Sequence, residues 1–138
     1  MRATSATVAE HLARLVELRD ATTDPARRLH VVASAYAEVC LHRAQHGTLE
    51  LSALTHAPER VAGAEEQLLE LFEQLLVDAA ETGAVRTDAS AGELALYCVH
   101  ALGAAGRLPS RASVQRLVSV TLTALEPAAP SSTARRGL

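Results

Sequence analysis

The chain has 138 residues, the size of one domain, and its hydrophobic fraction of 49% excludes a chain that is disordered throughout. The net charge is −3, lysine is absent and the arginines are scattered, so the chain lacks the basic surface that binds nucleic acid. Two distant cysteines, no signal-peptide pattern and no long apolar run predict a cytoplasmic protein that does not enter a membrane.

The spacing of the apolar residues predicts an all-α fold. Leu, Ala and Val dominate these positions and recur at the intervals of three and four residues that mark one face of a helix. No segment shows the strong alternation that is typical of a half-buried strand. The six predicted helices cover about 7–20, 25–46, 49–54, 59–82, 90–106 and 111–125.

Several helix ends carry local signals. Asp24 is a good N-cap, and Pro25 suits the first turn of the second helix. Gly83 is the expected residue after the fourth helix. Ser90 and Glu93 have the spacing of a capping box, in which each side chain accepts from the other's backbone amide. We expect one domain over residues 1–126 and a disordered tail over 127–138.

The fifth and sixth predicted helices are apolar on two sides. Leu94, Tyr97 and Cys98 are expected to face the core, yet the opposite side of the same helix is also apolar. One small core covers only one side, so we expect a second copy of the chain to cover the other in a four-helix dimer interface. The alternative is that both helices are central in a monomer. The expected interface residues are Leu96, Val99, His100, Gly103, Arg116, Val120, Thr123 and Ala124.

The turn after the fourth helix resembles a motif of TetR-family regulators. Residues 83–88, Gly-Ala-Val-Arg-Thr-Asp, match the G-x-V/L-R-x-D turn that commonly joins the long core helix of their C-terminal domain to the first dimerisation helix. The Asp24-Pro25 helix start, the Gly47 break and the final stop at Pro127 match in order and spacing. Within the family, the SbtR-like subgroup is the most similar.

This resemblance implies the six-helix, ligand-sensing and dimerising C-terminal domain of a TetR-type regulator, with residues 7–20 as the connecting helix. Such proteins begin with a helix-turn-helix domain, which we expect to be missing here, so DNA would be bound only through that domain. The implied partners are a small-molecule effector and a second subunit, in a homodimer or in a heterodimer with a full-length regulator. The alternative is a stand-alone helical interaction protein that titrates such a regulator.

The resemblance implies an effector cavity between the inward faces of the second, fourth and fifth helices. Tyr36, Arg43 and Tyr97 are the polar groups expected there, since binding pockets are mainly apolar with few polar groups. Alternatively, the aromatic residues are ordinary core and Arg43 reaches helix carbonyls or a carboxylate. The residues expected to line the cavity are Tyr36, Val39, Cys40, Arg43, Leu69, Phe72, Leu76, Tyr97 and Ala101.

Enzymatic, metal and cofactor chemistry are not expected. His42 and His46 have a spacing that can hold one metal ion, but a third ligand is lacking unless His56 or a glutamate supplies it. Neither cysteine lies in a nucleophile motif, and the sequence has no G-x-S-x-G pattern and no phosphate-binding loop. We therefore expect a binding domain without catalytic residues.

Overall fold

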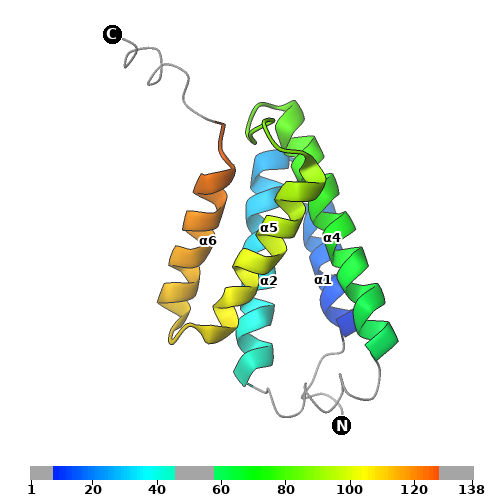
Figure 1. The fold of residues 1–138 in the computed structure, drawn as a ribbon, viewed down its shortest axis with the longest axis vertical. Coiled ribbons are helices and arrows are strands. Elements are labelled where there is room, and N and C mark those ends of the chain that lie inside the picture. The colour runs from blue at the N-terminus through cyan, green and yellow to red at the C-terminus, as the bar shows by residue number, and fades with distance from the viewer. Residues whose placement is uncertain (1–7, 46–57, 128–138) are drawn as a thin grey trace.

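The computed structural model describes residues 8–45 and 58–127, and this part of the chain is all-α, as predicted (Figure 1). The predicted helix over 49–54 and the tail beyond Pro127 lie outside the described residues. The elements are α1 (Val8–Ala21), α2 (Pro25–Gln45), α4 (Pro58–Glu81), α5 (Ala91–Gly103), the short 3₁₀ helix η2 (Ala104–Arg107) and α6 (Arg111–Leu125).

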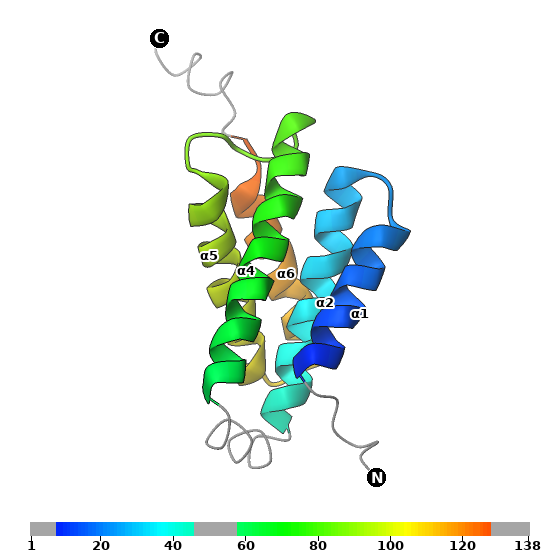
Figure 2. The same ribbon diagram turned by 90° about the vertical axis from the view of Figure 1, so that its right-hand side faces the viewer.

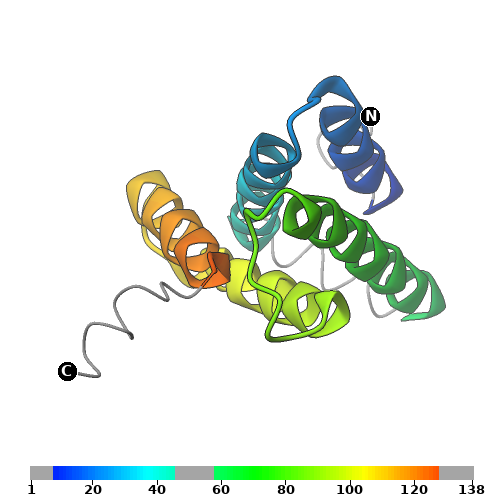
Figure 3. The ribbon, with the colours of Figure 1, turned by 90° about the horizontal axis from the view of Figure 1, so that it is seen from above.

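Helix α2 is central and contacts each of the other elements. Helix α1 packs against α2 and α4, whereas α6 packs against α2, α5 and η2. Seen from above, α1 and α6 therefore stand at opposite edges of the bundle (Figure 3). The first helix, α1, is thus separated from the last helix, α6.

The core is built from Leu, Val and Ala side chains around a single buried phenylalanine. Phe72 of α4 is fully buried, and the edge of its ring meets Tyr36 of α2, with 5.8 Å between the ring centroids. Leu15, Val32 and Leu102 bring α1, α2 and α5 into the same cluster. Because every long helix contributes side chains to this cluster, burial of its apolar surface holds the helices together.

The predicted helix-end signals are present in the structure. The carboxylate of Asp24 accepts a hydrogen bond from the amide of Arg27 at 2.9 Å, which caps α2. The Ser90 hydroxyl accepts from the Glu93 amide, and the Glu93 carboxylate accepts from the Ser90 amide, so the capping box of α5 is complete. Gly83 has a φ of +83°, the left-handed conformation that ends α4.

The turn between α4 and α5 is fastened to the end of α6. Val85 is buried, and the Arg86 amide donates to the carbonyl of Leu125 at 2.8 Å. The Arg86 guanidinium donates to the carbonyl of Ala124 and to both carboxylate oxygens of Asp88. The Val-Arg-x-Asp part of the motif thus satisfies carbonyl groups that the last turn of a helix leaves open.

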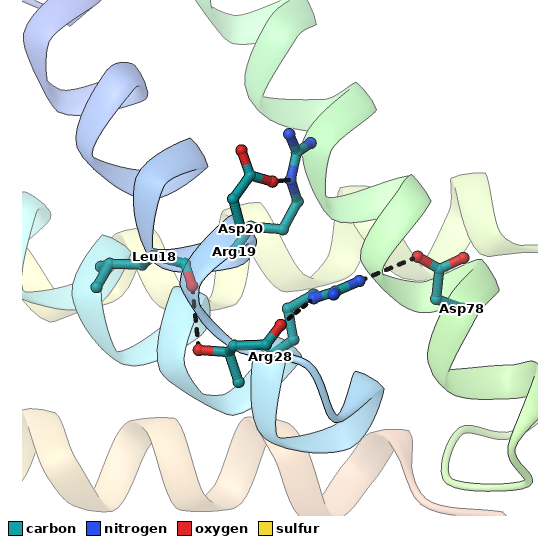
Figure 4. Close-up of polar contacts among 6 residues, drawn as sticks. Leu18, Arg19, Asp20, Arg28 and Asp78 are labelled. Atoms are coloured by element: carbon teal, nitrogen blue, oxygen red, sulfur yellow. Dashed lines mark hydrogen bonds and ion pairs between the residues drawn. The ribbon is translucent and has the colours of Figure 1, made fainter.

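Arg28 fastens the connection between α1 and α2 to helix α4 (Figure 4). Its Nε donates to the carbonyl of Thr22 at 2.8 Å, and its Nη1 lies 3.8 Å from a carboxylate oxygen of Asp78. The Thr22 hydroxyl in turn donates to the carbonyl of Leu18 near the end of α1. One side chain therefore links the C-terminal end of α1, the start of α2 and the second half of α4.

The side of α5 that packs against the core is not the predicted side. Val99, expected on the outer side, is 6% exposed, whereas Tyr97, expected inside, is 43% exposed. The expected directions of these two side chains were therefore wrong. The buried stripe consists of Leu94, Ala95, Cys98, Val99 and Leu102, which follows helical spacing but is rotated from the predicted stripe. A helix that is apolar nearly all round does not reveal from its own pattern which side packs inward.

The α-helical part of α5 also ends earlier than the expected Gly106. It stops at Gly103 and continues as η2, which lies against α2. A Cβ atom at Gly106 would lie 3.2 Å from the carbonyl oxygen of Cys40 and 3.1 Å from the Cβ of Ala44. Glycine is thus favoured at this position because the two backbones approach closely.

Candidate functional site

An open cleft of about 180 Å³ lies among α1, α2 and α4, with α5 behind it. It is found at the end of the bundle where α1 and α4 begin and α2 ends (Figure 2). Most of its wall is apolar, and the polar side chains are those of His11, Tyr36, Arg43 and Glu65. The remaining lining residues are Leu12, Leu15, Val39, Ala64, Leu68 and Val99.

Tyr36 is a half-buried polar group of the cleft wall. Burial raises the pKa of its hydroxyl well above the ordinary value of 10.0, and the neighbouring Cys40 raises it further by its charge and by a side-chain hydrogen bond. The charge of Arg43 acts in the opposite direction. The hydroxyl is therefore neutral at physiological pH and takes part in hydrogen bonds as an O–H group.

Cys40 lies one helical turn beyond Tyr36, and its thiol stays protonated. Burial raises the pKa of the thiol, while the hydrogen bond with Tyr36 and the charge of Arg43 partly offset that effect. Cys98 is buried in the core, and burial raises the pKa of its thiol to about 12. Both cysteines are free thiols. A thiol is a weak nucleophile compared with a thiolate, so neither side chain has the properties of a reactive cysteine.

The N-terminal half of α1 forms one side of the cleft. His11, Leu12 and Leu15 all line it. The His11 ring also meets the ring of His42 on α2 edge to face, with 6.5 Å between the centroids. The other end of α1 is the end that Arg28 fastens to α4. A molecule in the cleft would therefore touch α1 on the half that lies away from this attachment.

The fold and the cleft can be compared with known families. The family model described as "Transcriptional regulator SbtR-like, C-terminal domain" matches residues 28–127. The chain belongs to this family of TetR-type C-terminal domains. Comparison with curated proteins and with solved structures gave no match. The family places the chain among domains of transcription regulators and supports a ligand-sensing and dimerising role.

The structure brings together three of the predicted ligand-binding residues of this TetR-type domain. Tyr36, Val39 and Arg43 line the cleft. Cys40 and Phe72 lie directly beside Tyr36, one as its hydrogen-bonding partner and the other behind its ring. The other four are placed elsewhere: Leu69 and Ala101 are half-buried outside the cleft lining, Leu76 is in the core, and Tyr97 is on the outer side of α5.

Sequence reasoning missed the parts of the cleft that α1 and the first half of α4 provide. These residues are His11, Leu12, Leu15, Ala64, Glu65 and Leu68, and Val99 was assigned to the interface instead. A signal was present, because Leu12 with Leu15 and Ala64 with Leu68 have helical spacing on apolar stripes. The sequence did not show that these two stripes meet.

A second candidate surface lies on the outer sides of α5 and α6. Leu96, Tyr97 and Val120 are 50%, 43% and 65% exposed, and they are three of the four exposed large hydrophobic residues in the described part of the chain. The fourth is Val77 on α4. Of the predicted interface residues, all but Val99 are exposed: Leu96, His100, Gly103, Arg116, Val120, Thr123 and Ala124.

Two further features of the described helices bear on function. Over residues 8–45 and 58–127, no helix is both long and apolar enough to cross a membrane. The same residues contain no group of three or more His, Cys, Asp and Glu side chains arranged to hold a metal ion. Two of the histidines considered for a metal site, His46 and His56, lie outside the described part.

Proposed function

We propose that the domain senses a small-molecule effector in the cleft among α1, α2 and α4 and transmits its presence through α1. The observation that carries this proposal is the composition of the cleft. Its wall is mainly apolar, with four polar side chains from three helices, as is typical of a small-molecule site. Since α1 supplies one wall, an effector that favours one position of α1 shifts the domain between two states.

The effector site can be tested by closing the cleft. Ala64→Phe places a ring in the lining of the cleft at a half-buried position, whereas Ala13→Phe adds the same ring on the exposed side of α1. A library of small apolar and amphipathic molecules is screened by thermal shift against the wild type and both variants. Molecules that stabilise the wild type and A13F but not A64F support the proposal. Stabilisation that persists in A64F places the effector site elsewhere.

We also propose that two copies pair through α5 and α6. The exposed side chains of Leu96, Tyr97 and Val120 support this pairing, because large apolar side chains gathered on a surface mark an interaction site. Gly103 and Ala124 are small, which permits close approach of helices from two subunits. The central four-helix arrangement predicted from the sequence would bury these side chains.

Sedimentation velocity distinguishes this pairing from a monomer. The double variant Leu96→Glu, Val120→Glu puts charges on the proposed interface and is expected to be monomeric at concentrations where the wild type is dimeric. Val77→Glu is the matched control, since it alters the exposed hydrophobic residue of α4 and leaves α5 and α6 intact. A wild type that is monomeric at high concentration contradicts a homodimer. In that case, pairing with a full-length regulator becomes the alternative.

A further inference from the structure

The polar groups of the cleft carry the most specific chemistry among the side chains outside the core. We propose that the effector is a small monocarboxylic acid with an apolar body, whose carboxylate binds Arg43. This inference rests on the proposed effector site and adds the chemical class of its ligand. It depends on three properties of the cleft: the position of its charges, the state of Tyr36 and its size.

The first property is the unequal placement of two opposite charges. Arg43 is half-buried in the cleft wall, whereas Glu65 is exposed at its edge. The charges of Arg43 and Glu65 act on the pKa of Tyr36 in opposite directions, and the charge of Arg43 also acts on that of Cys40. Charges that are less exposed to water interact more strongly with a bound molecule. The interior of the cleft therefore favours an anionic group over a cationic one.

The geometry of the guanidinium suits a carboxylate in particular. Arginine presents five N–H donors in a planar fork, and a carboxylate accepts two of them at once. This number of donors lets Arg43 bind an incoming carboxylate and still contact another acceptor, such as a neighbouring carboxylate. A ligand with one carboxylate can therefore be bound by two of these donors.

The second property is that Tyr36 stays neutral. Its buried hydroxyl remains protonated, so it supplies no negative charge to compete with an acid for Arg43. The hydroxyl lies one helical turn from Cys40 and two turns before Arg43 on α2, on the same wall of the cleft. Tyr36 and Arg43 thus lie along α2. His11 of α1 and Glu65 of α4 are the polar groups of the other walls, which are otherwise lined by leucine, alanine and valine. A mainly apolar lining beside a half-buried guanidinium fits a ligand with a polar head and an apolar body.

The third property is the size of the cleft. A buried water molecule needs roughly 10–15 Å³ of free volume, so about 180 Å³ has room for on the order of ten non-hydrogen atoms. This volume fits a medium-chain fatty acid or an aromatic acid with a short side chain.

The test compares ligands that differ only in the head group. Isothermal titration calorimetry at neutral pH measures the affinity of the full chain for octanoate, 4-phenylbutyrate, 1-octanol and octylamine. We expect the two acids to bind about tenfold more tightly than the alcohol or the amine, because a charge-assisted hydrogen bond contributes on this scale. Equal affinities for octanoate and octanol would overturn the assignment of an acid. Failure of both acids to bind would also overturn it.

Substitutions in the cleft wall distinguish an error in the ligand class from an error in the binding site. Arg43→Gln is expected to lower the affinity for octanoate about tenfold and leave the affinity for octanol unchanged. The control Arg14→Gln removes an exposed charge of α1 outside the cleft and is expected to change neither. Circular dichroism verifies that both variants fold. If R43Q binds octanoate like the wild type while Ala64→Phe abolishes binding, the cleft is the site but the acid class is wrong. If A64F binds octanoate normally, both proposals fail.

Discussion

Arg86 binds both carboxylate oxygens of Asp88, with its Nε and one Nη each 2.7 Å from an oxygen. The other Nη donates to the carbonyl of Ala124 in the last turn of α6 at 3.0 Å. Asp88 therefore orients the guanidinium that caps α6. The arginine and the aspartate of the G-x-V/L-R-x-D turn therefore have a structural role, which is to cap the end of α6.

Replacement of Arg86 by methionine is expected to loosen the end of α6. The variant keeps the apolar stem but loses the three side-chain hydrogen bonds, so the melting temperature should fall by a few degrees. Hydrogen exchange should rise selectively in the last turn of α6. Arg27→Met, which removes an exposed arginine from α2, serves as the control. Equal exchange in the two variants would show that Arg86 does not hold the helix end.

The pairing of Arg86 with Asp88 predicts a loss of stability in acid. The hydrogen bond from Arg86, followed by its charge, lowers the pKa of Asp88 below the ordinary value of 3.8. A carboxyl group whose pKa is lower in the folded state stabilises that state above its unfolded pKa. The stabilisation declines as the pH falls through the folded pKa. The stability difference between the wild type and Asp88→Asn, measured by urea denaturation, should therefore be largest near neutral pH and shrink below about pH 4. A difference that is independent of pH would contradict this role.

Gly83→Ala and Gly63→Ala should have opposite effects on stability. Neither added Cβ atom would meet another atom within 4 Å, so only the backbone conformation differs between the sites. Gly83 has a positive φ, where alanine costs about 1 kcal/mol. Gly63 lies inside α4, where alanine is more favourable than glycine by roughly 0.5–1 kcal/mol. Urea denaturation should show G83A less stable and G63A more stable than the wild type, and the same sign for both would refute this account.

Gly106→Ala is expected to be destabilising for a different reason. The added methyl group would press against the carbonyl of Cys40 and the side chain of Ala44, and such overpacking costs about 1–3 kcal/mol. Gly92→Ala adds the same group in the first turn of α5, where the nearest atom, a carboxylate oxygen of Glu73, lies 3.9 Å away. Thermal and urea denaturation should therefore separate the two variants. If G106A loses no more stability than G92A, then η2 does not approach α2 as closely as the structure indicates.

Arg28→Met should release the C-terminal end of α1. The variant loses the hydrogen bond to the Thr22 carbonyl and the ion pair with Asp78, both partly exposed, so the free energy of unfolding should fall by about 1 kcal/mol. Hydrogen exchange should increase in α1 more than in α5. The neighbouring exposed arginine provides a control, since Arg27→Met should leave exchange in α1 unchanged. Unchanged exchange in R28M would mean that the apolar packing of α1 holds this helix without Arg28.

The sequence predicted the helices well where local chemistry decides their ends. Asp24, Gly83 and Ser90 each act through hydrogen bonds or backbone conformation within a few residues, so their effects can be derived from the sequence alone. The capping role of Arg86 was not foreseen, since its partner Ala124 is far away in the sequence.

The candidate site was predicted only on the side that α2 provides. Tyr36, Val39 and Arg43 share one helix, and their common face follows from spacing alone. The walls from α1 and α4 depend on how three helices pack, which no single periodic pattern specifies. Tyr97 is the clearest case of a side-chain direction that could not be predicted from the sequence. Its helix is apolar nearly all round, so spacing alone did not determine whether this ring points inward or outward.

The placement of α1 and α6 at opposite edges of the bundle has a consequence for how such a domain can change. Among the described residues, these two helices share no contact, and both are anchored on α2. Substitutions in α1 that change the shape of the cleft need not change the surface of α6. If the cleft and the α5–α6 surface act as proposed, the ligand specificity can change through substitutions in α1 while the pairing of subunits is kept.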